Sequence, residues 1–329
     1  MATMQDIADK TGFNISTISR ALNGNRDISE STRQIILDAK KTLGYENKKM
    51  RQFAKKTIGI IVPELHHQPY IDMLQNIQNI LHSKGFTTII TISGYSPEEI
   101  RISVREMKRL EISGVFVVTS IIKEKQLKEV ISMLSGIPTL FLSETNHLLP
   151  VDTIFIDQSY IIDIIVQHLK ERKCAEIAYF GEHLSNIRLE ILIDSCKENG
   201  IVLRENMIFN GIKRSEEAGY SHAKRYLKRN DRPDTIVASY DQIAIGAMRA
   251  FHEAGVLVPE DVAIMGIDDE QVAKYLPTRL TSVKTPVNQM CSIAVKLLLN
   301  QIAFPREHVV QHVSLLSKLI VRESSRRSV

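Results

Sequence analysis

The amino-acid sequence predicts an α/β protein in which two doubly wound parallel-sheet subdomains follow a small all-α domain. Over most of the chain, short β-branched runs such as 58–62 and 87–92 alternate with amphipathic segments such as 71–83. This alternation is typical of βα units, whose strands pair in parallel beneath helices. Residues 1–57 instead show three short helical patterns. With 329 residues, the chain has room for two or three domains with full cores.

The composition is that of a globular protein without extracellular or membrane features. Apolar residues make up 43% and charged residues 24% of the chain, a balance that excludes long disordered regions. Cys174, Cys196 and Cys291 lack CxxC spacing, so neither a disulfide framework nor a zinc cluster is predicted. The start of the chain lacks a signal-peptide pattern, and no stretch reaches the roughly 18 apolar residues of a membrane span. We therefore expect a cytoplasmic protein without a membrane partner.

The excess positive charge lies at the N-terminal end of the chain. Residues 1–57 hold 11 Lys or Arg against 6 Asp or Glu, a net charge of +5. The whole chain carries +4, so the remaining 272 residues carry −1. Six of the basic residues fall between Lys41 and Lys56. Such a segment suits contact with nucleic-acid phosphates, although a solvated helix end followed by a linker has the same composition.

The N-terminal segment predicts three short helices with the spacing of a helix-turn-helix unit. The first, over 5–10, stops at Gly12, and Asn14 is a good N-cap for the second, over 15–22. The third begins after Ser29 as its N-cap. In such a unit the second helix enters the major groove of DNA and reaches base edges. Five residues form this surface: Ile15, Ser16, Thr17, Ser19 and Arg20. A plain three-helix bundle is the alternative.

Residues 3–45 also carry the signatures of a known family. They contain Asp-Ile-Ala, Ser-Thr-Ile-Ser-Arg-Ala-Leu-Asn and Leu-Gly-Tyr, and they closely resemble the DNA-binding headpiece of the lactose and galactose repressor (LacI/GalR) family of transcriptional regulators. The resemblance places Ile15, Ser16 and Arg20 at base-reading positions. It places five further residues where family members touch or approach the DNA backbone: Thr3, Asn14, Ser19, Asn23 and Ser29.

The same resemblance extends over almost the whole chain. It rests on the runs TIGIIVPE, LTSVKTPVNQM and IVRESS and on the longer run from Arg232 to Asp269. The core of the family is similar to periplasmic sugar-binding proteins, and it implies a ligand cleft between two subdomains. The implied division is a headpiece at 1–45, a hinge at 46–57 and a core at 58–329, with an N-subdomain of 58–157 plus 287–318 and a C-subdomain of 158–286 plus 319–329.

Five core residues are candidate effector ligands by this resemblance. Asp268 lies in a Gly-x-Asp-Asp element that accepts hydrogen bonds from effector hydroxyls in the family. Arg188 matches an arginine whose fork of donors suits hydroxyls or carboxylates, unless it is a surface arginine at a helix start. Tyr70 either stacks on a sugar or joins the core. Tyr240 and Ser143 stand where the family usually has Asn and Asp, so we expect a different effector from that of common members.

The predicted hinge is shorter than in the family. Only residues 46–56 separate the headpiece from the first core strand, Asn47 replaces the usual Pro, and the usual Leu that wedges into the minor groove is absent. Met50 and Phe53 are the large apolar residues available as a wedge. They lie three apart and would share one face if a hinge helix forms.

The sequence thus predicts a homodimeric transcriptional repressor. We expect paired headpieces on a pseudo-palindromic double-stranded operator and a small effector, a sugar or sugar derivative, that shifts operator affinity allosterically. The end of the chain lacks the heptads of a tetramerising helix, which favours a dimer. A solute-binding receptor of the periplasmic sugar-binding type is the alternative. We expect no enzyme, cofactor or metal, because GxGxxG and GxSxG motifs are absent and His66 and His67 lack metal-ligand spacing.

Overall fold

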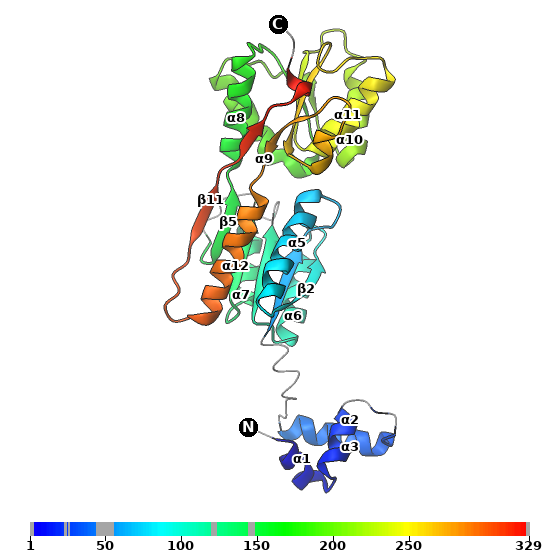
Figure 1. The fold of residues 1–329 in the computed structure, drawn as a ribbon, viewed down its shortest axis with the longest axis vertical. Coiled ribbons are helices and arrows are strands. Elements are labelled where there is room, and N and C mark those ends of the chain that lie inside the picture. Colours follow the sequence, from blue (N-terminus) through cyan, green and yellow to red (C-terminus); the bar gives the residue numbers. More distant parts are fainter. Residues whose placement is uncertain are drawn as a thin grey trace.

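The structure, a computed structural model, describes residues 3–22, 25, 27–43, 56–119, 124–143 and 149–326. A three-helix domain lies at one end, and two α/β lobes follow, one stacked on the other (Figure 1). Three of the predicted DNA-contacting residues, Asn23, Met50 and Phe53, lie outside the described residues. Within the described ranges, no helix is both long enough and apolar enough to span a membrane.

The N-terminal domain consists of α1 (Met4–Thr11), α2 (Ile15–Leu22) and α3 (Glu30–Leu43). Thr3 and Asp6 form a capping box at the start of α1, in which each side chain accepts a hydrogen bond from the backbone amide of the other. Gly12 ends α1 with a φ of 75°, a left-handed conformation that glycine adopts without strain. One fully buried isoleucine from each helix fills the centre of the domain: Ile7, Ile18 and Ile36.

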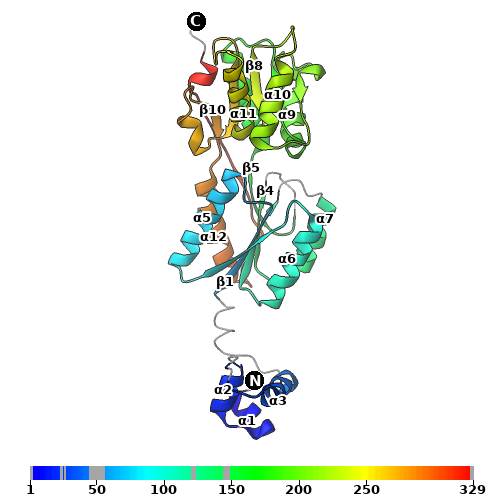
Figure 2. The same ribbon diagram turned by 90° about the vertical axis from the view of Figure 1, so that its right-hand side faces the viewer.

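The first lobe is a six-stranded parallel sheet in the order β11-β5-β4-β3-β1-β2. Its strands are β1 (Thr57–Val62), β2 (Thr87–Ile92), β3 (Gly114–Thr119), β4 (Thr139–Ser143), β5 (Asp152–Ile156) and β11 (His312–Leu315). One face packs against α5 (Gln68–Ser83) and α12 (Val287–Ala303), and the other against α6 (Pro97–Arg109) and α7 (Glu124–Met133) (Figure 2). Helices on both faces explain why β1 and β3 are buried along their whole length.

The second lobe has the same architecture, with the sheet order β12-β10-β9-β8-β6-β7. Its strands are β6 (Ala178–Phe180), β7 (Ile208–Phe209), β8 (Thr235–Ala238), β9 (Ala263–Asp268), β10 (Thr281–Lys284) and β12 (Lys318–Ile320). Only β12 runs antiparallel to its neighbour among the described strands. The helices α8 (Gln158–Glu171) and α9 (Asn186–Glu198) cover one face, and α10 (Ser215–Tyr226) and α11 (Asp241–Glu253) cover the other.

Three segments connect the lobes: β5 leads into α8, β10 into α12, and β11 into β12. These crossings place α12 and β11 in the first lobe although they follow the second lobe in the sequence. The carboxyl ends of four strands then meet at one cavity between the lobes, which Thr119, Ser143, Ile156 and Asp268 line. This edge is where open α/β sheets bind ligands.

Candidate functional site

The second helix of the N-terminal domain presents a polar face to solvent. On α2, Ile18 and Ala21 point into the domain, whereas Ser16 and Arg20 lie on the exposed side. Of the five residues predicted to form the base-reading surface, Ile15, Ser16 and Arg20 are exposed. Thr17 and Ser19 are half-buried. The helix therefore brings them to one face or its edges, where a partner can reach them.

Three of the predicted backbone-contacting residues are helix N-caps in the free protein. Thr3 caps α1. The Asn14 side-chain oxygen accepts a hydrogen bond from the Thr17 amide at 2.8 Å, and the Ser29 hydroxyl accepts one from the Thr32 amide at 3.2 Å. Helix N-termini expose backbone N–H groups and partial positive charge, which attract phosphate. The starts of the three helices are thus chemically suited to a DNA backbone.

Arg20 has a partner in the free protein. Its Nη1 lies 2.7 Å from Asp27 Oδ2, and both side chains are about half exposed. Exposed ion pairs contribute only about 0–1 kcal/mol, whereas a bidentate contact between arginine and guanine discriminates by about 1–3 kcal/mol. Asp27 can therefore orient the guanidinium without preventing a base contact.

The cleft between the lobes contains a small cavity. Four of the five predicted effector residues line it: Tyr70, Ser143, Arg188 and Asp268. Tyr240 lines an adjoining smaller cavity that shares His67 and Tyr70 with the first. The first cavity measures about 40 Å³, which is room for a few water molecules at roughly 10–15 Å³ each. A sugar does not fit this volume, so its entry would require the lobes to separate or a lining side chain to move.

The two walls of this cavity differ in chemistry. The first lobe contributes mostly apolar side chains, among them Tyr70, Met73, Val118, Leu142 and Met290. The second lobe contributes Gln158, Arg188 and Asp268. A ligand with an apolar face and a row of hydroxyl groups along one edge would match both walls.

Arg188 is buried at the start of α9, with an exposed fraction of 4%. Its Nε donates to Gln158 Oε1 at 2.9 Å, and its Nη1 donates to the Ser239 carbonyl at 2.5 Å. The guanidinium also lies over the Tyr240 ring, 5.1 Å from the centroid. These contacts hold the guanidinium in one orientation and decide against a surface arginine.

Asp268 ends β9 with its side chain inside the cavity and only 4% exposed. Its φ of 108° is uncommon for a residue with a side chain and is typical of functional positions. Burial alone would raise the pKa of this carboxyl, but the contact with His67 and the charge of Arg188 outweigh burial and lower the pKa. Asp268 is therefore an ionised hydrogen-bond acceptor at neutral pH.

The sequence did not predict two residues of this site, Gln158 and His67, and it indicated His67 only as a possible metal ligand. Its Nε2 lies 3.2 Å from Asp268 Oδ2. Its ring meets Tyr70 and Tyr240 edge-on, with centroids 5.4 and 5.1 Å apart. No group of three or more possible metal ligands occurs in the described parts of the chain. The available signal was the position of His67 just before a helix, where a capping side chain is usual.

A second charged cluster joins the lobes beside the smaller cavity. Both oxygens of Glu64, which follows β1, accept hydrogen bonds from Arg214, which precedes α10, at 2.6 and 2.8 Å. The Tyr95 hydroxyl donates to the same carboxylate at 2.8 Å, and Arg214 Nε reaches Glu182 at 3.3 Å. Burial alone would raise the pKa of Glu64, but the hydrogen bonds from Arg214 and Tyr95 outweigh it and lower the pKa.

Two further carboxyl groups lie near Asp268. Asp241 is fully buried, accepts hydrogen bonds from the Ser282 hydroxyl at 2.6 Å and the Glu270 amide at 2.8 Å, and has a pKa raised well above its usual value by burial. Burial and the charge of Asp268 raise the pKa of Glu270 to about 7. Because both groups hold protons more tightly than usual, Asp268 carries the main negative charge here.

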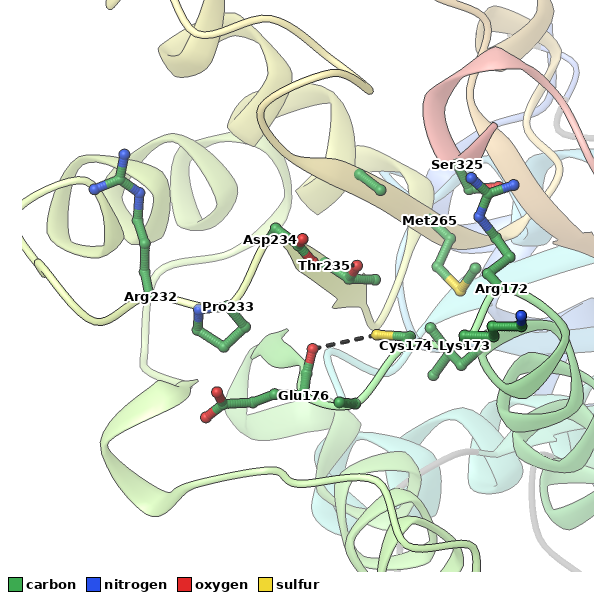
Figure 3. Close-up of a pocket in the computed structure, with 13 residues that line it drawn as sticks. Arg172, Lys173, Cys174, Glu176, Arg232, Pro233, Asp234, Thr235, Met265 and Ser325 are labelled. Atoms are coloured by element: carbon green, nitrogen blue, oxygen red, sulfur yellow. Dashed lines mark hydrogen bonds between the residues drawn. The ribbon is translucent and has the colours of Figure 1, made fainter. Parts of the chain in front are cut away.

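A larger cavity of about 530 Å³ lies at the amino-terminal ends of β6, β8 and β9, away from the cleft (Figure 3). The Cys174 thiol donates to the Glu176 carbonyl at 3.2 Å on its wall, while the Glu176 carboxylate points away from the thiol. None of the predicted effector residues lines this cavity. The predicted effector residues therefore all lie at the cleft and not at this larger cavity.

Known proteins resemble the chain along nearly its whole length. Residues 3–47 match the family described as bacterial regulatory proteins, lacI family, and residues 166–325 match the periplasmic binding protein-like domain. The HTH-type transcriptional regulator AscG of Escherichia coli K12 is 30% identical over 300 residues, which cover 88% of this chain and 89% of AscG. The chain belongs to the LacI family. It is therefore a DNA-binding transcriptional regulator. Membership in this family supports the regulator predicted from the sequence over the alternatives of a solute-binding receptor or an enzyme.

Solved structures share the fold of this LacI-family chain. The lac repressor dimer bound to operator and the anti-inducer ONPF has a TM-score of 0.76 at 21% identity, with 98% of this chain and 99% of that chain covered. The transcriptional regulator CelR in complex with cellobiose has a TM-score of 0.71 at 24% identity, with 99% and 100% covered. The predicted fold, a helix-turn-helix headpiece before two doubly wound subdomains, is thereby confirmed.

Proposed function

We propose that this LacI-family regulator is a homodimeric repressor whose operator affinity changes when a small carbohydrate-like effector enters the cleft. The observation that carries the proposal is the convergence of Tyr70 from one lobe with Arg188 and Asp268 from the other on one cavity. A ligand that touches both lobes favours one arrangement of the lobes over another. The first lobe is the neighbour of the headpiece in the sequence, so its arrangement can bias how two headpieces meet DNA.

The headpiece is proposed to read the operator through α2. Ile15, Ser16 and Arg20 would contact base edges, with Thr17 and Ser19 at the margin of the same face. Thr3, Asn14, Asn23 and Ser29 would contact or approach the DNA backbone, and Met50 and Phe53 would act as wedges in the minor groove. The exposure of α2 and the N-cap hydrogen bonds of Thr3, Asn14 and Ser29 support this assignment.

The effector is proposed to be a sugar or sugar derivative. An apolar wall that includes Tyr70 suits the apolar face of a pyranose, and ionised Asp268 suits its hydroxyl groups. Arg188, Ser143 and Tyr240 would complete the contacts. The solved complex of CelR with cellobiose, which shares this fold, supports a carbohydrate ligand.

Two exposed apolar surfaces support a homodimer. Leu257 and Tyr275 are 59% and 72% exposed beside an apolar groove on α11. Ile90 and Ile92 are 40% and 53% exposed on β2, an edge strand of the first sheet. Figure 1 shows β2 and α11 on the same side of the molecule. A second copy covering both surfaces about a two-fold axis would bury them and pair the headpieces for two half-sites.

We further propose the domain division that the sequence predicts, with a headpiece at 1–45, a hinge at 46–57 and a core at 58–329. The proposed N-subdomain (58–157 and 287–318) and C-subdomain (158–286 and 319–329) are supported by the two separate sheets and their own cores. The proposed location is the cytoplasm, where a bacterial regulator meets its operator DNA.

Selection of binding sites from a random duplex library tests the DNA-binding part of the proposal. The full chain should enrich two inverted half-sites, and a footprint should cover both at once. The half-sites should lie about one helical turn or a multiple of it apart, centre to centre. Enrichment of a single half-site would contradict the homodimer, and enrichment of no sequence would contradict operator recognition.

A further inference from the structure

We propose that His67 is an internal, displaceable ligand of Asp268. In the effector-free protein its imidazole fills the place in front of the carboxylate, and an effector that binds Asp268 takes the place of the imidazole. This inference rests on the proposed function, because it assumes that the cleft is the effector site. It makes His67 a determinant of effector affinity rather than a passive part of the wall.

The contact between His67 and Asp268 bridges the two lobes. His67 stands before α5 in the first lobe, and Asp268 ends β9 in the second. Their Nε2 and Oδ2 atoms lie 3.2 Å apart, and the side chains are only 12% and 4% exposed. Separation of the lobes would therefore draw the imidazole away from the carboxylate and free it for another ligand.

The surroundings of the imidazole are those of a bound small ring. Tyr70 and Tyr240 meet it edge-on, and Asp268 Oδ2 lies 3.2 Å from its Nε2. Polar rings bind in proteins through this combination of aromatic contact and an ionised acceptor. A ligand that replaces the imidazole must offer the same two features, which describes a ring with an apolar face and a hydroxyl or N–H donor.

The start of α5 would favour a different residue at position 67. His67 is the N-cap of this helix, and its side chain makes no capping hydrogen bond. Ser, Thr, Asp or Asn at an N-cap stabilises a helix relative to a residue that cannot cap. The chain instead has an imidazole that reaches across the cleft. Departures from local preference of this kind are typical of functional positions.

The imidazole of His67 also takes up space in this small cavity. Only about 40 Å³ is open beside Asp268 while the imidazole is in place. An effector must therefore exchange with the imidazole rather than add to it. The apparent affinity of any ligand of the Asp268 carboxylate is then reduced in proportion to the fraction of protein in which the imidazole has left it.

Complementation of His67→Ser by free imidazole tests the proposal. Serine removes the ring and can cap α5, so the variant should fold. Calorimetric scans with rising imidazole concentration should show a saturable increase in the Tm of His67→Ser, because a ligand that binds only the native state stabilises it. Wild type and the matched control His66→Ser should show no such shift. His66 is exposed, and its carbonyl, which accepts from Gln242 at 3.4 Å, is unchanged by the substitution.

The double variant His67→Ser/Asp268→Asn should lose the imidazole shift. Absence of a shift in His67→Ser, or an equal shift in wild type, His66→Ser or the double variant, would overturn the proposal. If His67→Ser does not unfold cooperatively, His67→Asn, which also caps a helix, carries the same test. The experiment uses neither operator nor sugar, so its failure is distinguishable from a failure of the proposed effector response.

Discussion

Arg214 of the second lobe binds both carboxylate oxygens of Glu64 in the first, at 2.6 and 2.8 Å. The same guanidinium faces Glu182, whose side chain is 1% exposed. One cation thus serves two buried carboxylates, one on each lobe. Lobe separation breaks the contact with Glu64 and leaves the contact with Glu182, so this ion pair favours the closed arrangement.

Unfolding in urea can measure how much Glu64 and Arg214 each contribute to the free energy of unfolding. Glu64→Gln should lower the free energy of unfolding by about 1 kcal/mol, because Arg214 keeps Glu182 as a partner. Arg214→Met should cost more, about 2–3 kcal/mol, because two buried carboxylates lose their cation, although partial exposure of the arginine moderates the loss.

The matched control for Arg214→Met is Lys213→Met. Lys213 is the preceding residue and pairs with Glu217 at 2.6 Å, but both side chains are more than half exposed. The control should change the free energy of unfolding by less than about 0.5 kcal/mol. Equal losses in Glu64→Gln and Arg214→Met would argue against the shared-cation arrangement.

The raised pKa of Glu270 predicts a loss of stability as the pH rises from about 4.5 to about 7. Burial and the charge of Asp268 raise its pKa from 4.5 to about 7, so the folded protein holds this proton more tightly than the unfolded chain. The stabilising contribution of the proton is complete at pH values below the unfolded pKa and disappears as the pH rises to about 7. Glu270→Gln mimics the protonated form and should raise the free energy of unfolding at pH 8 by about 1–3 kcal/mol.

Urea unfolding at pH 5 and pH 8 checks this expectation. The gain from Glu270→Gln should be much smaller at pH 5 than at pH 8. Glu205→Gln, at an exposed position, should change neither value. A gain of the same size at both pH values would show that the titration of Glu270 is not its cause.

Much of the fold could be predicted from local patterns in the sequence. Gly12 and the N-caps Asn14 and Ser29 indicate the ends of the headpiece helices, and β-branched runs indicate the buried strands. The short strand β11 could not be found in this way, because its alternation of polar and apolar residues spans only four positions, none of them fully buried. Its place in the first sheet depends on a crossing between lobes that no local pattern encodes.

The candidate site was only partly predictable. Asp268 lies in a run that resembles the family, Tyr70 and Arg188 match single positions of its pattern, and the three residues do meet at one cavity. The contacts of His67 with Asp268 and of Glu64 with Arg214 join residues that are far apart in the sequence. The sequence around one residue of such a pair does not indicate which residue it will contact. Only the tertiary structure therefore reveals these two contacts.

Arg20→Ala should weaken specific operator binding by about 1–3 kcal/mol and relax the preference at one base pair. The reason is the exposed position of Arg20 on α2. Quantitative footprinting on the selected operator measures both effects. Asp27→Ala, which removes the partner but keeps the guanidinium, should cost no more than about 1 kcal/mol. Unchanged affinity and selectivity in Arg20→Ala would mean that α2 is not the recognition helix.

The exposed apolar surfaces predict how the dimer can be broken. Light scattering at micromolar concentration should report a dimer for wild type and a monomer for the double variant Ile92→Asp/Tyr275→Asp, because buried unpaired charge is costly. The control is Val309→Asp, which changes a residue that is 74% exposed near β11, at the opposite edge of the first sheet. A wild-type monomer or tetramer, or a dimer that survives the double variant, would contradict the proposed interface.

The central claim is that a ligand in the cleft changes operator affinity, and fluorescence anisotropy of a labelled operator tests it most directly. Titrations of wild type should be run with and without each member of a panel of mono- and disaccharides. We expect at least one sugar to change the operator Kd by about 5- to 150-fold, which corresponds to about 1–3 kcal/mol of coupling. Asp268→Asn should lose the response when its operator Kd with each sugar is compared with its own ligand-free Kd. A wild-type Kd that no sugar changes, or an Asp268→Asn variant that responds like wild type, would contradict the account.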